Sequence, residues 1–369
     1  MPKNDPLWEC SLRTKAKLEI LNHYLGAWFG ILAANRFTHV FYIDGFCGPG
    51  KYLTGEEGSP VIAARLASDT AQRYNNFKAT LIFIDKNTKV IEHLKNLDAI
   101  KKQHPNITID IIEGDFADKI SNILETLRHN RKSPTFSFID PFGFSHTPLD
   151  KIKELMHNDS SEIFVNLWCG PMNRFKDHPD DEITLNIKNM VGDDNLDEIR
   201  NSDDCIDAIC SAFENNLKNI GQYTRKFEIR NERNARVNAL VFCGKNSKGF
   251  EKIKEAMWKI DREHGKTFSA FEERKRNIQP VLFSGPDTNA LFSMILEKFG
   301  GQQKVSVKEI FRWVIDKTET FLPTHARVEL DRLVDRGFIT SIGDTKNPTR
   351  KRRKGQWPPH LILNFGDSE

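Results

Sequence analysis

The first half of the chain alternates short, nearly continuous apolar runs with stretches whose apolar residues recur at a helical period. Such runs are typical of parallel strands buried on both faces, and the 3.6-residue period is typical of amphipathic helices. The runs that predict strands are residues 40–44, 80–85, 107–112, 135–139 and 162–168. The stretches that predict helices are residues 14–34, 60–67, 90–99, 120–127 and 149–156. Strand–helix units in series predict an α/β fold with a doubly wound, mostly parallel sheet and a binding crevice at the carboxyl ends of its strands.

A more polar region follows these units. Residues 173–222 are acidic in patches and mostly helical in pattern, which indicates an insertion or a cap over the crevice. Residues 227–230 and 237–243 predict the last strands of the sheet, and residues 250–260 predict an amphipathic helix packed on it.

The composition changes around residues 279–286, which marks a domain boundary. We therefore expect one domain over residues 1–285 and a second over residues 286–369. The second domain has three predicted helices and two predicted strands, at residues 291–299, 307–314, 324–336, 337–342 and 361–365. Three short helices followed by a hairpin predict a winged helix.

Composition narrows the class of protein without naming a function. The 369 residues include 38% hydrophobic and 28% charged residues, as expected of a globular protein with a buried core. The net charge of +3 is too small to establish a nucleic-acid partner by itself. The six cysteines form no C-x-x-C pair, which favours free thiols in a reducing compartment over a zinc or iron–sulfur site. Without a signal peptide or an apolar run of membrane-spanning length, we expect a cytoplasmic protein with no membrane partner.

The first predicted strand ends in the loop Asp44-Gly-Phe-Cys-Gly-Pro-Gly50. Glycine lets a backbone approach a ligand closely, but the G-x-x-G-x-G spacing is neither the dinucleotide fingerprint nor a P-loop. The loop resembles the D-x-F-x-G-x-G loop of class I S-adenosylmethionine (AdoMet)-dependent methyltransferases, where the glycines lie against the methionine part of the cofactor. The alternative is a structural tight turn.

Acids at the ends of successive strands strengthen the cofactor interpretation. Asp85, after the second strand, is placed to accept both ribose hydroxyls, and Asp115, after the third, to accept from the adenine amine. Each acid alone has the alternative role of a solvated strand end or a helix N-cap. The predicted cofactor-binding residues are Asp44, Gly45, Phe46, Gly48, Gly50, Asp85, Asp115 and Phe116.

The fourth strand ends in Asp140-Pro-Phe-Gly143. This motif is similar to the D/N-P-P-Y/F motif of amino-methyltransferases and to the D-P-F-G of tRNA guanine-N2 dimethyltransferases. The resemblance implies that Asp140 and the Pro141 carbonyl accept hydrogen bonds from an exocyclic amine, and that Phe142 stacks on the extruded base. These three residues are the predicted catalytic residues, and the alternative is a structural Asp-Pro turn.

With these residues in view, the chain resembles the three-Cys-motif partner family over roughly residues 10–285. The shared segments are Thr14–Leu21, Tyr42–Gly50, Gly58–Pro60, Phe83–Lys86, Asp140–Gly143 and Lys252–Asp261. The resemblance implies a Rossmann-like, class I methyltransferase-like fold and pairing with a three-Cys-motif, radical-AdoMet-like protein. It does not imply a settled reaction.

A basic segment near the carboxyl end lies between the last two predicted strands, at the position of a wing tip. Six basic residues without an acid would neutralise several phosphates, and a tryptophan could pack on a sugar or a base. The predicted nucleic-acid-binding residues are Lys346, Arg350, Lys351, Arg352, Arg353, Lys354 and Trp357. Arg327, Arg332 and Arg336 on the preceding helix could face a groove. The alternative for the segment is a solvated loop.

Three functions remain open at this point. The first is AdoMet-dependent methylation of an exocyclic amine of a DNA or RNA base. The second is a non-catalytic partner that uses the same surfaces to deliver nucleic acid to another enzyme. The weakest is a repair nuclease in which Asp44, Asp115 and Asp140 bind a divalent metal.

Overall fold

The computed structural model describes residues 7–130, 132–144, 147–156, 158–192, 195–278, 285–344, 346 and 352–366. The chain divides into two compact units. Unit 1 comprises residues 1–260 and 266–281, and unit 2 comprises residues 261–265 and 282–369. The predicted boundary between residues 285 and 286 stays a prediction, because residues 279–284 lie outside the described part of the chain.

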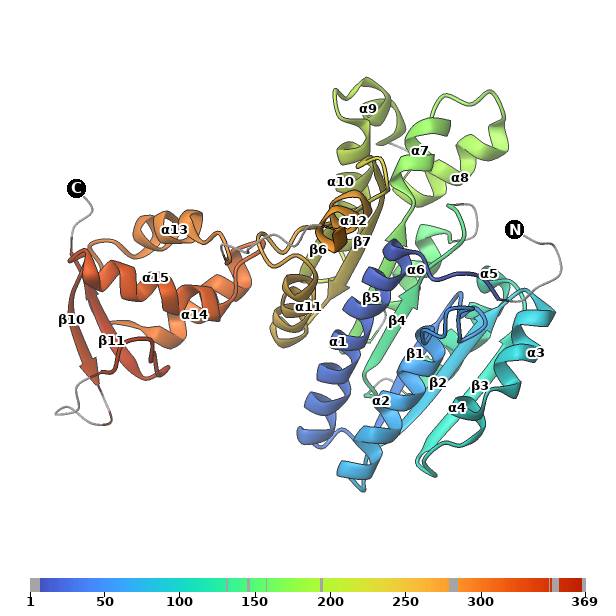
Figure 1. Cartoon of the computed structure of the whole chain (residues 1–369), viewed down its shortest axis with the longest axis horizontal. Helices are drawn as coiled ribbons and strands as arrows, with labels where there is room; N and C mark the ends of the chain where they lie inside the picture. The colour runs from blue at the N-terminus through green and yellow to red at the C-terminus, as the bar shows by residue number, and fades with distance from the viewer. Residues whose placement is uncertain are drawn as a thin grey trace. The chain divides into compact units, whose positions relative to one another are not determined.

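Unit 1 is built on an eight-stranded sheet within the described residues, in the order β3-β2-β1-β4-β5-β7-β6-β8 (Figure 1). Its strands are β1 (His39–Asp44), β2 (Lys78–Asp85), β3 (Ile107–Glu113), β4 (Thr135–Ile139), β5 (Ser161–Leu167), β6 (Tyr223–Arg230), β7 (Arg236–Gly244) and β8 (Thr267–Ser269). Strands β1 to β5 are parallel, and β7 runs antiparallel to both β5 and β6. The predicted doubly wound, mostly parallel sheet is confirmed.

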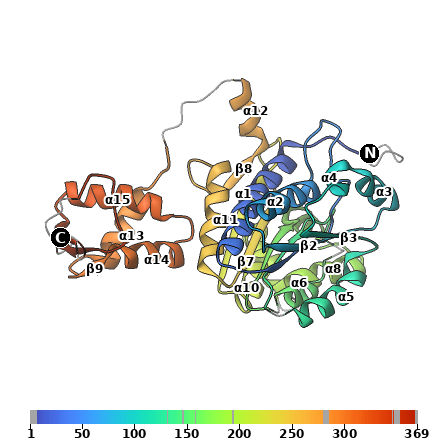
Figure 2. The same ribbon diagram turned by 90° about the horizontal axis from the view of Figure 1, so that it is seen from below.

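Helices cover both faces of this sheet (Figure 2). One layer contains α1 (Leu12–Ala34), α2 (Ser59–Arg73), α3 (Thr88–Asn96), α4 (Asp98–Lys101) and α11 (Ser247–Ile260). The other layer contains α5 (Phe116–His129), α6 (Leu149–Leu155), α7 (Cys169–Phe175), α8 (Asp181–Val191), α9 (Leu196–Asn201) and α10 (Cys205–Lys218). A further helix, α12 (Ala270–Ile278), contacts α1, β6 and β8. Burial on both faces explains why the central strands read as continuous apolar runs.

Strand order puts the expected position of a ligand at β1. The chain continues from β1 to β2 on one side and returns to β4 on the other, so β1 lies at the topological switch point of the sheet. Ligands of open α/β sheets bind outside the carboxyl ends of the strands at this point. Asp44, Asp85 and Asp140 all lie at that edge.

Part of the segment predicted as an insertion or cap, residues 173–222, packs on the sheet. Helix α10 packs on β6 and β7, and its residues Ile209, Phe213 and Leu217 are buried in the core of the sheet's second face. Their spacing of four residues puts them on one helix face, so α10 belongs to the covering layer rather than to a cap.

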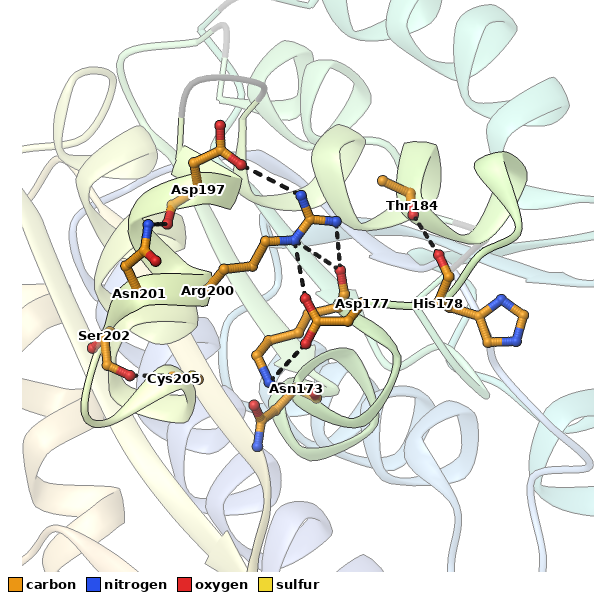
Figure 3. A network of polar contacts seen from close by, with 10 residues as sticks. Asn173, Asp177, His178, Thr184, Asp197, Arg200, Asn201, Ser202 and Cys205 are labelled. Atoms are coloured by element: carbon orange, nitrogen blue, oxygen red, sulfur yellow. Dashed lines mark hydrogen bonds and ion pairs between the residues drawn. The ribbon is translucent and has the colours of Figure 1, made fainter.

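The preceding helices are tied together by one arginine (Figure 3). Arg200 of α9 forms ion pairs with Asp177 at 3.2 Å and Asp197 at 3.3 Å, and donates to the Lys176 carbonyl at 2.9 Å. These contacts fasten α9 to the end of α7.

Unit 2 contains three helices and a three-stranded antiparallel sheet within its described residues. Its elements are α13 (Asn289–Phe299), β9 (Val305–Ser306), α14 (Val307–Lys317), α15 (Pro323–Asp335), β10 (Ile339–Asp344) and β11 (Leu361–Phe365). The sheet order is β10-β11-β9. One apolar core packs the three helices against the sheet. It includes Leu291 of α13, Ile310 of α14 and Leu330 of α15.

A buried carboxyl links α1 to β5 in unit 1. The Tyr24 hydroxyl donates to Glu162 Oε2 at 2.6 Å, and both side chains are buried. Burial raises the pKa of Glu162 to about 7, against an ordinary value of 4.5. The hydrogen bond from Tyr24 opposes this shift but does not cancel it.

This pKa predicts a loss of stability as the pH rises. The folded state holds the Glu162 proton up to about pH 7, whereas the unfolded chain releases it near 4.5, so the contribution of this group is lost as pH rises through 7. Relative to Glu162→Gln, the free energy of unfolding of the wild type should fall by about 3 kcal/mol between pH 4.5 and about pH 8. Urea unfolding of both proteins across this range measures the difference. A difference that stays constant with pH would contradict the prediction.

Candidate functional site

The glycine loop is fastened to the neighbouring strands by its own backbone. Gly45 N–H donates to the Phe138 carbonyl of β4 at 3.0 Å, and Cys47 N–H donates to the Ile84 carbonyl of β2 at 2.9 Å. The next amide, of Gly48, donates to Asp85 Oδ2 at 3.1 Å. The loop is therefore held on both sides at the switch point.

The three glycines have different roles. A Cβ on Gly45 would lie 2.8 Å from the Phe116 ring, and one on Gly50 would lie 2.6 Å from Leu94, so the protein's own side chains fill that space. Gly48 has a φ of +62° and its Cβ would meet nothing nearer than Trp8, at 3.8 Å. The backbone is therefore least crowded at Gly48, where the Trp8 ring lies at ordinary contact distance, while the other two glycines serve packing.

The residues between the glycine loop and α2 bring the chain back to Gly50. Residues 51–57 form a small hairpin closed by a bridge between Lys51 and Glu57, and Gly58 N–H donates to the Gly50 carbonyl at 2.7 Å. Helix α2 then begins at Ser59. Its amino terminus thus lies next to the glycine loop despite the inserted residues.

Asp44 is completely buried at the end of β1. Burial raises the pKa of its carboxyl to about 7, although hydrogen bonds from Ser59 and the Phe46 amide act in the opposite direction. The Tyr42 hydroxyl also donates to it at 3.3 Å. Asp44 therefore anchors the loop to the sheet and to α2.

Asp85 ends β2 with each carboxylate oxygen accepting one backbone N–H. The donors are Gly48 at 3.1 Å and Asn87 at 2.8 Å. The side chain is 7% exposed, and burial raises the pKa of its carboxyl above the ordinary value. Each oxygen of a carboxylate accepts more than one hydrogen bond, so capacity for ribose hydroxyls remains.

Asp115 and Phe116, the two cofactor-binding residues predicted after the third strand, have structural roles: one caps a helix and the other packs in the core. Asp115 is the N-cap of α5 and accepts from the Ala117 amide at 3.0 Å. Phe116 is 1% exposed and its ring packs against Phe46, with centroids 5.5 Å apart. The prediction that Phe116 contacts the cofactor needs correction, because its ring is enclosed in the core beneath Gly45.

Asp140 lies at the centre of a charged network that joins three elements. The Lys17 ammonium of α1 donates to its two oxygens at 2.8 and 2.6 Å, and the Asn166 amide of β5 donates at 2.6 Å. Asn166 is fully buried, and its Oδ1 has no hydrogen-bond partner within the described structure.

The rest of the motif is also engaged. The Trp168 indole N–H donates to the Pro141 carbonyl at 2.6 Å. Both acceptors that the motif would offer to an amine are thus occupied by N–H donors of the chain itself. Phe142, in contrast, is 58% exposed, and the Trp8 ring meets it edge-on with centroids 5.8 Å apart.

Sequence reasoning missed Lys17, Asn166, Trp168 and Trp8. Lys17 lies on the first helix, where its side chain is 13% exposed and bound to Asp140. Asn166 left a usable signal, because an amide near the carboxyl end of an apolar parallel strand points to the same edge as the other strand-end residues.

The basic segment of unit 2 is partly neutralised. Arg352 pairs with Asp331 at 2.7 Å, and Lys354 pairs with Asp335 at 2.7 Å, both acids lying on α15. Lys346 and Arg353 are exposed. Arg350 and Lys351 lie outside the described residues.

One further expectation for unit 2 needs correction. Trp357 is 3% exposed in the core of the unit and Arg352 covers its ring at 4.0 Å, so the ring is not available to a sugar or base. Arg332 and Arg336 lie over the Phe292 ring, and Arg327 over Phe311. Arg327 and Arg336 are nevertheless exposed, so a groove-facing role for these arginines stays a prediction.

The metal hypothesis lacks a site. Within the described residues, which include Asp44, Asp115 and Asp140, no group of three or more His, Cys, Asp or Glu side chains is arranged to hold a metal ion. Nor does any helix in the described part of the chain combine the length and apolar character needed to cross a bilayer.

No protein-family model and no curated protein matches this chain. Solved structures with a similar fold include the O-methyltransferase TomG from Streptomyces achromogenes in complex with SAM, at 13% identity and a TM-score of 0.33, covering 60% of this chain and 79% of that one. Another is the O-methyltransferase from Bacillus cereus in complex with SAH, at 11% identity and a TM-score of 0.33, covering 59% and 80%. A third is protein LPL1258 from Legionella pneumophila, at 11% identity and a TM-score of 0.35, covering 62% and 84%.

Unit 1 has a class I methyltransferase-like, Rossmann-like fold. This assignment rests on the strand order, the parallel crossovers and the antiparallel β7 described above rather than on these low similarity scores. The likeness does not extend to substrate or partner, and nothing in it concerns the three-Cys-motif partner family.

Proposed function

We propose that this chain binds AdoMet at the carboxyl ends of β1 to β3 and methylates an exocyclic amine of a DNA or RNA base. The observation that carries the proposal is the hydrogen bond of Gly48 to Asp85, which fixes the glycine loop beside a buried carboxylate at the switch point. A sulfonium cofactor would supply an already activated methyl group. The protein's task is then alignment rather than activation.

Named residues of the chain fit this cofactor. Asp85 would accept the ribose hydroxyls while keeping its bonds to Gly48 and Asn87. Asp115, which lies at the start of α5, would face the adenine amine. Gly48 gives the methionine part access to the backbone.

For the acceptor amine to bind Asp140, that carboxylate must give up its present hydrogen bonds with Lys17. Asp140 would orient the amine, but Lys17 occupies both of its oxygens, so the amine of the base would take the place of the Lys17 ammonium. Lysine has a flexible stem and three rotatable donors, which suits such an exchange. Phe142 is exposed and would stack on the base.

Nucleic-acid binding and partnership extend the same proposal. Lys346 and Arg353 of unit 2 are exposed and would contact phosphates, although the pairing of Arg352 and Lys354 limits the charge available. The topology of unit 2 supports a winged helix. The resemblance to the three-Cys-motif partner family supports a radical-AdoMet-like partner protein.

The occupied acceptors favour a second candidate, a non-catalytic partner that delivers nucleic acid to another enzyme. A motif whose carboxylate and carbonyl are both bound by the chain's own donors, Lys17, Asn166 and Trp168, is also what a structural turn requires. This candidate predicts nucleic-acid binding that weakens with salt and survives Asp140→Ala.

Calorimetric titration tests the proposed cofactor directly. We expect AdoMet and S-adenosylhomocysteine each to bind the full chain with one site per molecule. Incubation with methyl-labelled AdoMet and a mixture of DNA and RNA should then place label in nucleic acid. No heat of binding at high micromolar ligand would refute the proposal, and binding without label transfer would favour the non-catalytic candidate.

A further inference from the structure

A cavity lies where the parallel strands of the sheet begin, whereas the candidate site lies where they end. Its volume is about 960 Å³, within the range of roughly 300–1,000 Å³ that is usual for small-molecule sites. It is lined by the carboxyl-terminal half of α1, the starts of β4 and β5, and the start of α11. Pro134 lines it directly before β4, whereas Asp140 follows β4, so the length of that strand, roughly 17 Å, separates the two sites.

One wall of the cavity is apolar and includes a glycine, Gly30, beside open space. Trp28, Ile31 and Phe37 line this wall together with Gly30. A Cβ added to Gly30 would meet no atom within 4 Å, so the helix backbone itself faces open space. A flat apolar group could therefore lie directly on α1 without displacing any side chain.

The other wall is basic. Lys248 and Lys252 come from the first turns of α11, whose amino terminus adds a partial positive charge. Their bonds to Glu251 and Glu255, each 2.6 Å, are partly exposed i,i+3 pairs along one helix, and pairs of this kind contribute only a small stabilisation. Lys245 is fixed to the carbonyls of Met156 and Asn158 and supplies charge without moving.

Two acids also line the cavity, and they offset only part of the charge of its three lysines. Glu162 is buried against Tyr24 and keeps its proton up to about pH 7. Asp159 is exposed to solvent. The chemistry of the walls is thus apolar on one side and cationic on the other.

We propose that this cavity binds an amphipathic small-molecule anion, with an apolar or aromatic body against Trp28, Ile31 and Phe37 and an acidic group at Lys248 and Lys252. The charge of the α11 wall selects the anion, and the bare backbone at Gly30 accommodates its body. This site is independent of the proposed methyl transfer.

The dye 1-anilinonaphthalene-8-sulfonate is a suitable probe, because it combines an aromatic body with one sulfonate. We expect saturable binding to the full chain at one site, with a rise in dye fluorescence. Gly30→Leu should weaken it at least about ten-fold by filling the cavity, and Lys248→Glu with Lys252→Glu should weaken it by a similar factor through charge reversal. Glu19→Leu on α1 introduces the same leucine, and Lys259→Glu on α11 one of the same charge reversals, at exposed positions outside the cavity, and both should leave binding unchanged.

Thermal melting of each variant separates loss of the site from loss of the fold. Because leucine favours a helix more than glycine does, Gly30→Leu should melt no lower than the wild type. Binding that survives Gly30→Leu, or that ignores both lysine changes, would overturn the proposal. So would a concentration-dependent dimer that Gly30→Leu dissociates, since this face would then be an interface between copies of the chain.

Discussion

Asp85→Ala should lower the affinity for AdoMet by about 100-fold, because it removes the charged acceptor of the ribose hydroxyls. Hydrogen bonds to a charged group contribute about 1.5–3 kcal/mol each, and a loss of about 3 kcal/mol corresponds to slightly more than a hundred-fold in Kd. The substitution also frees the amides of Gly48 and Asn87, which loosens the loop on the methionine side. Calorimetric titration of the variant with AdoMet measures the effect.

A control distinguishes cofactor binding from general damage. Asp69 is an exposed aspartate of α2, and Asp69→Ala should bind AdoMet as the wild type does. If Asp85→Ala bound AdoMet with unchanged affinity while remaining folded by circular dichroism, the carboxylate would serve only to fasten the loop. The assignment of the ribose site to β2 would then be abandoned.

The strand-end acids could be predicted because their signals are local. A continuous apolar run followed by an acid identifies a parallel strand and the edge at which it ends, and this is correct for Asp44, Asp85 and Asp140. The rule for parallel crossovers leaves few arrangements of the strands but does not choose among them.

Partners of those acids could not be predicted in the same way. Lys17 and Asp140 are 123 residues apart in sequence, and nothing in the pattern of the first helix marks one lysine as turned inward. Trp168 and Pro141 are 27 residues apart, joined only by the pairing of β4 with β5. Contacts of this kind depend on the packed fold, and they change the interpretation of the motif from an open acceptor to an occupied one.

Residue type alone was misleading where packing decides the role. Phe116 and Trp357 look like ligand-stacking aromatics in sequence, but both rings are buried in apolar clusters. Glycines show the same ambiguity. Positions 45 and 50 require glycine because the Phe116 and Leu94 side chains occupy the space that a Cβ would need. The spacing of glycines in a sequence therefore indicates that another group lies close to the backbone, but it does not distinguish a ligand from a side chain of the protein.

Asp140→Ala should reduce methyl transfer to nucleic acid by about 100-fold or more while leaving AdoMet affinity unchanged, because it removes the group that aligns the acceptor amine. Asp150→Ala, at an exposed position of α6, is the matched control and should retain activity. Label transfer under saturating AdoMet measures the loss. Unchanged transfer by a folded Asp140→Ala protein would reduce the motif to a structural turn.

Lys17→Met sharpens the same test, because the two roles of the ion pair predict opposite results. If the acceptor amine must displace the Lys17 ammonium from Asp140, removing that ammonium should lower the KM for nucleic acid, whereas Lys17→Arg should keep the competition. If the pair serves only to hold α1 against β4, Lys17→Met should leave a partly buried carboxylate bound by Asn166 alone, lower the melting temperature and leave KM unchanged. KM and melting temperature measured on the same preparations therefore decide whether Lys17 marks the place of the acceptor or locks a turn.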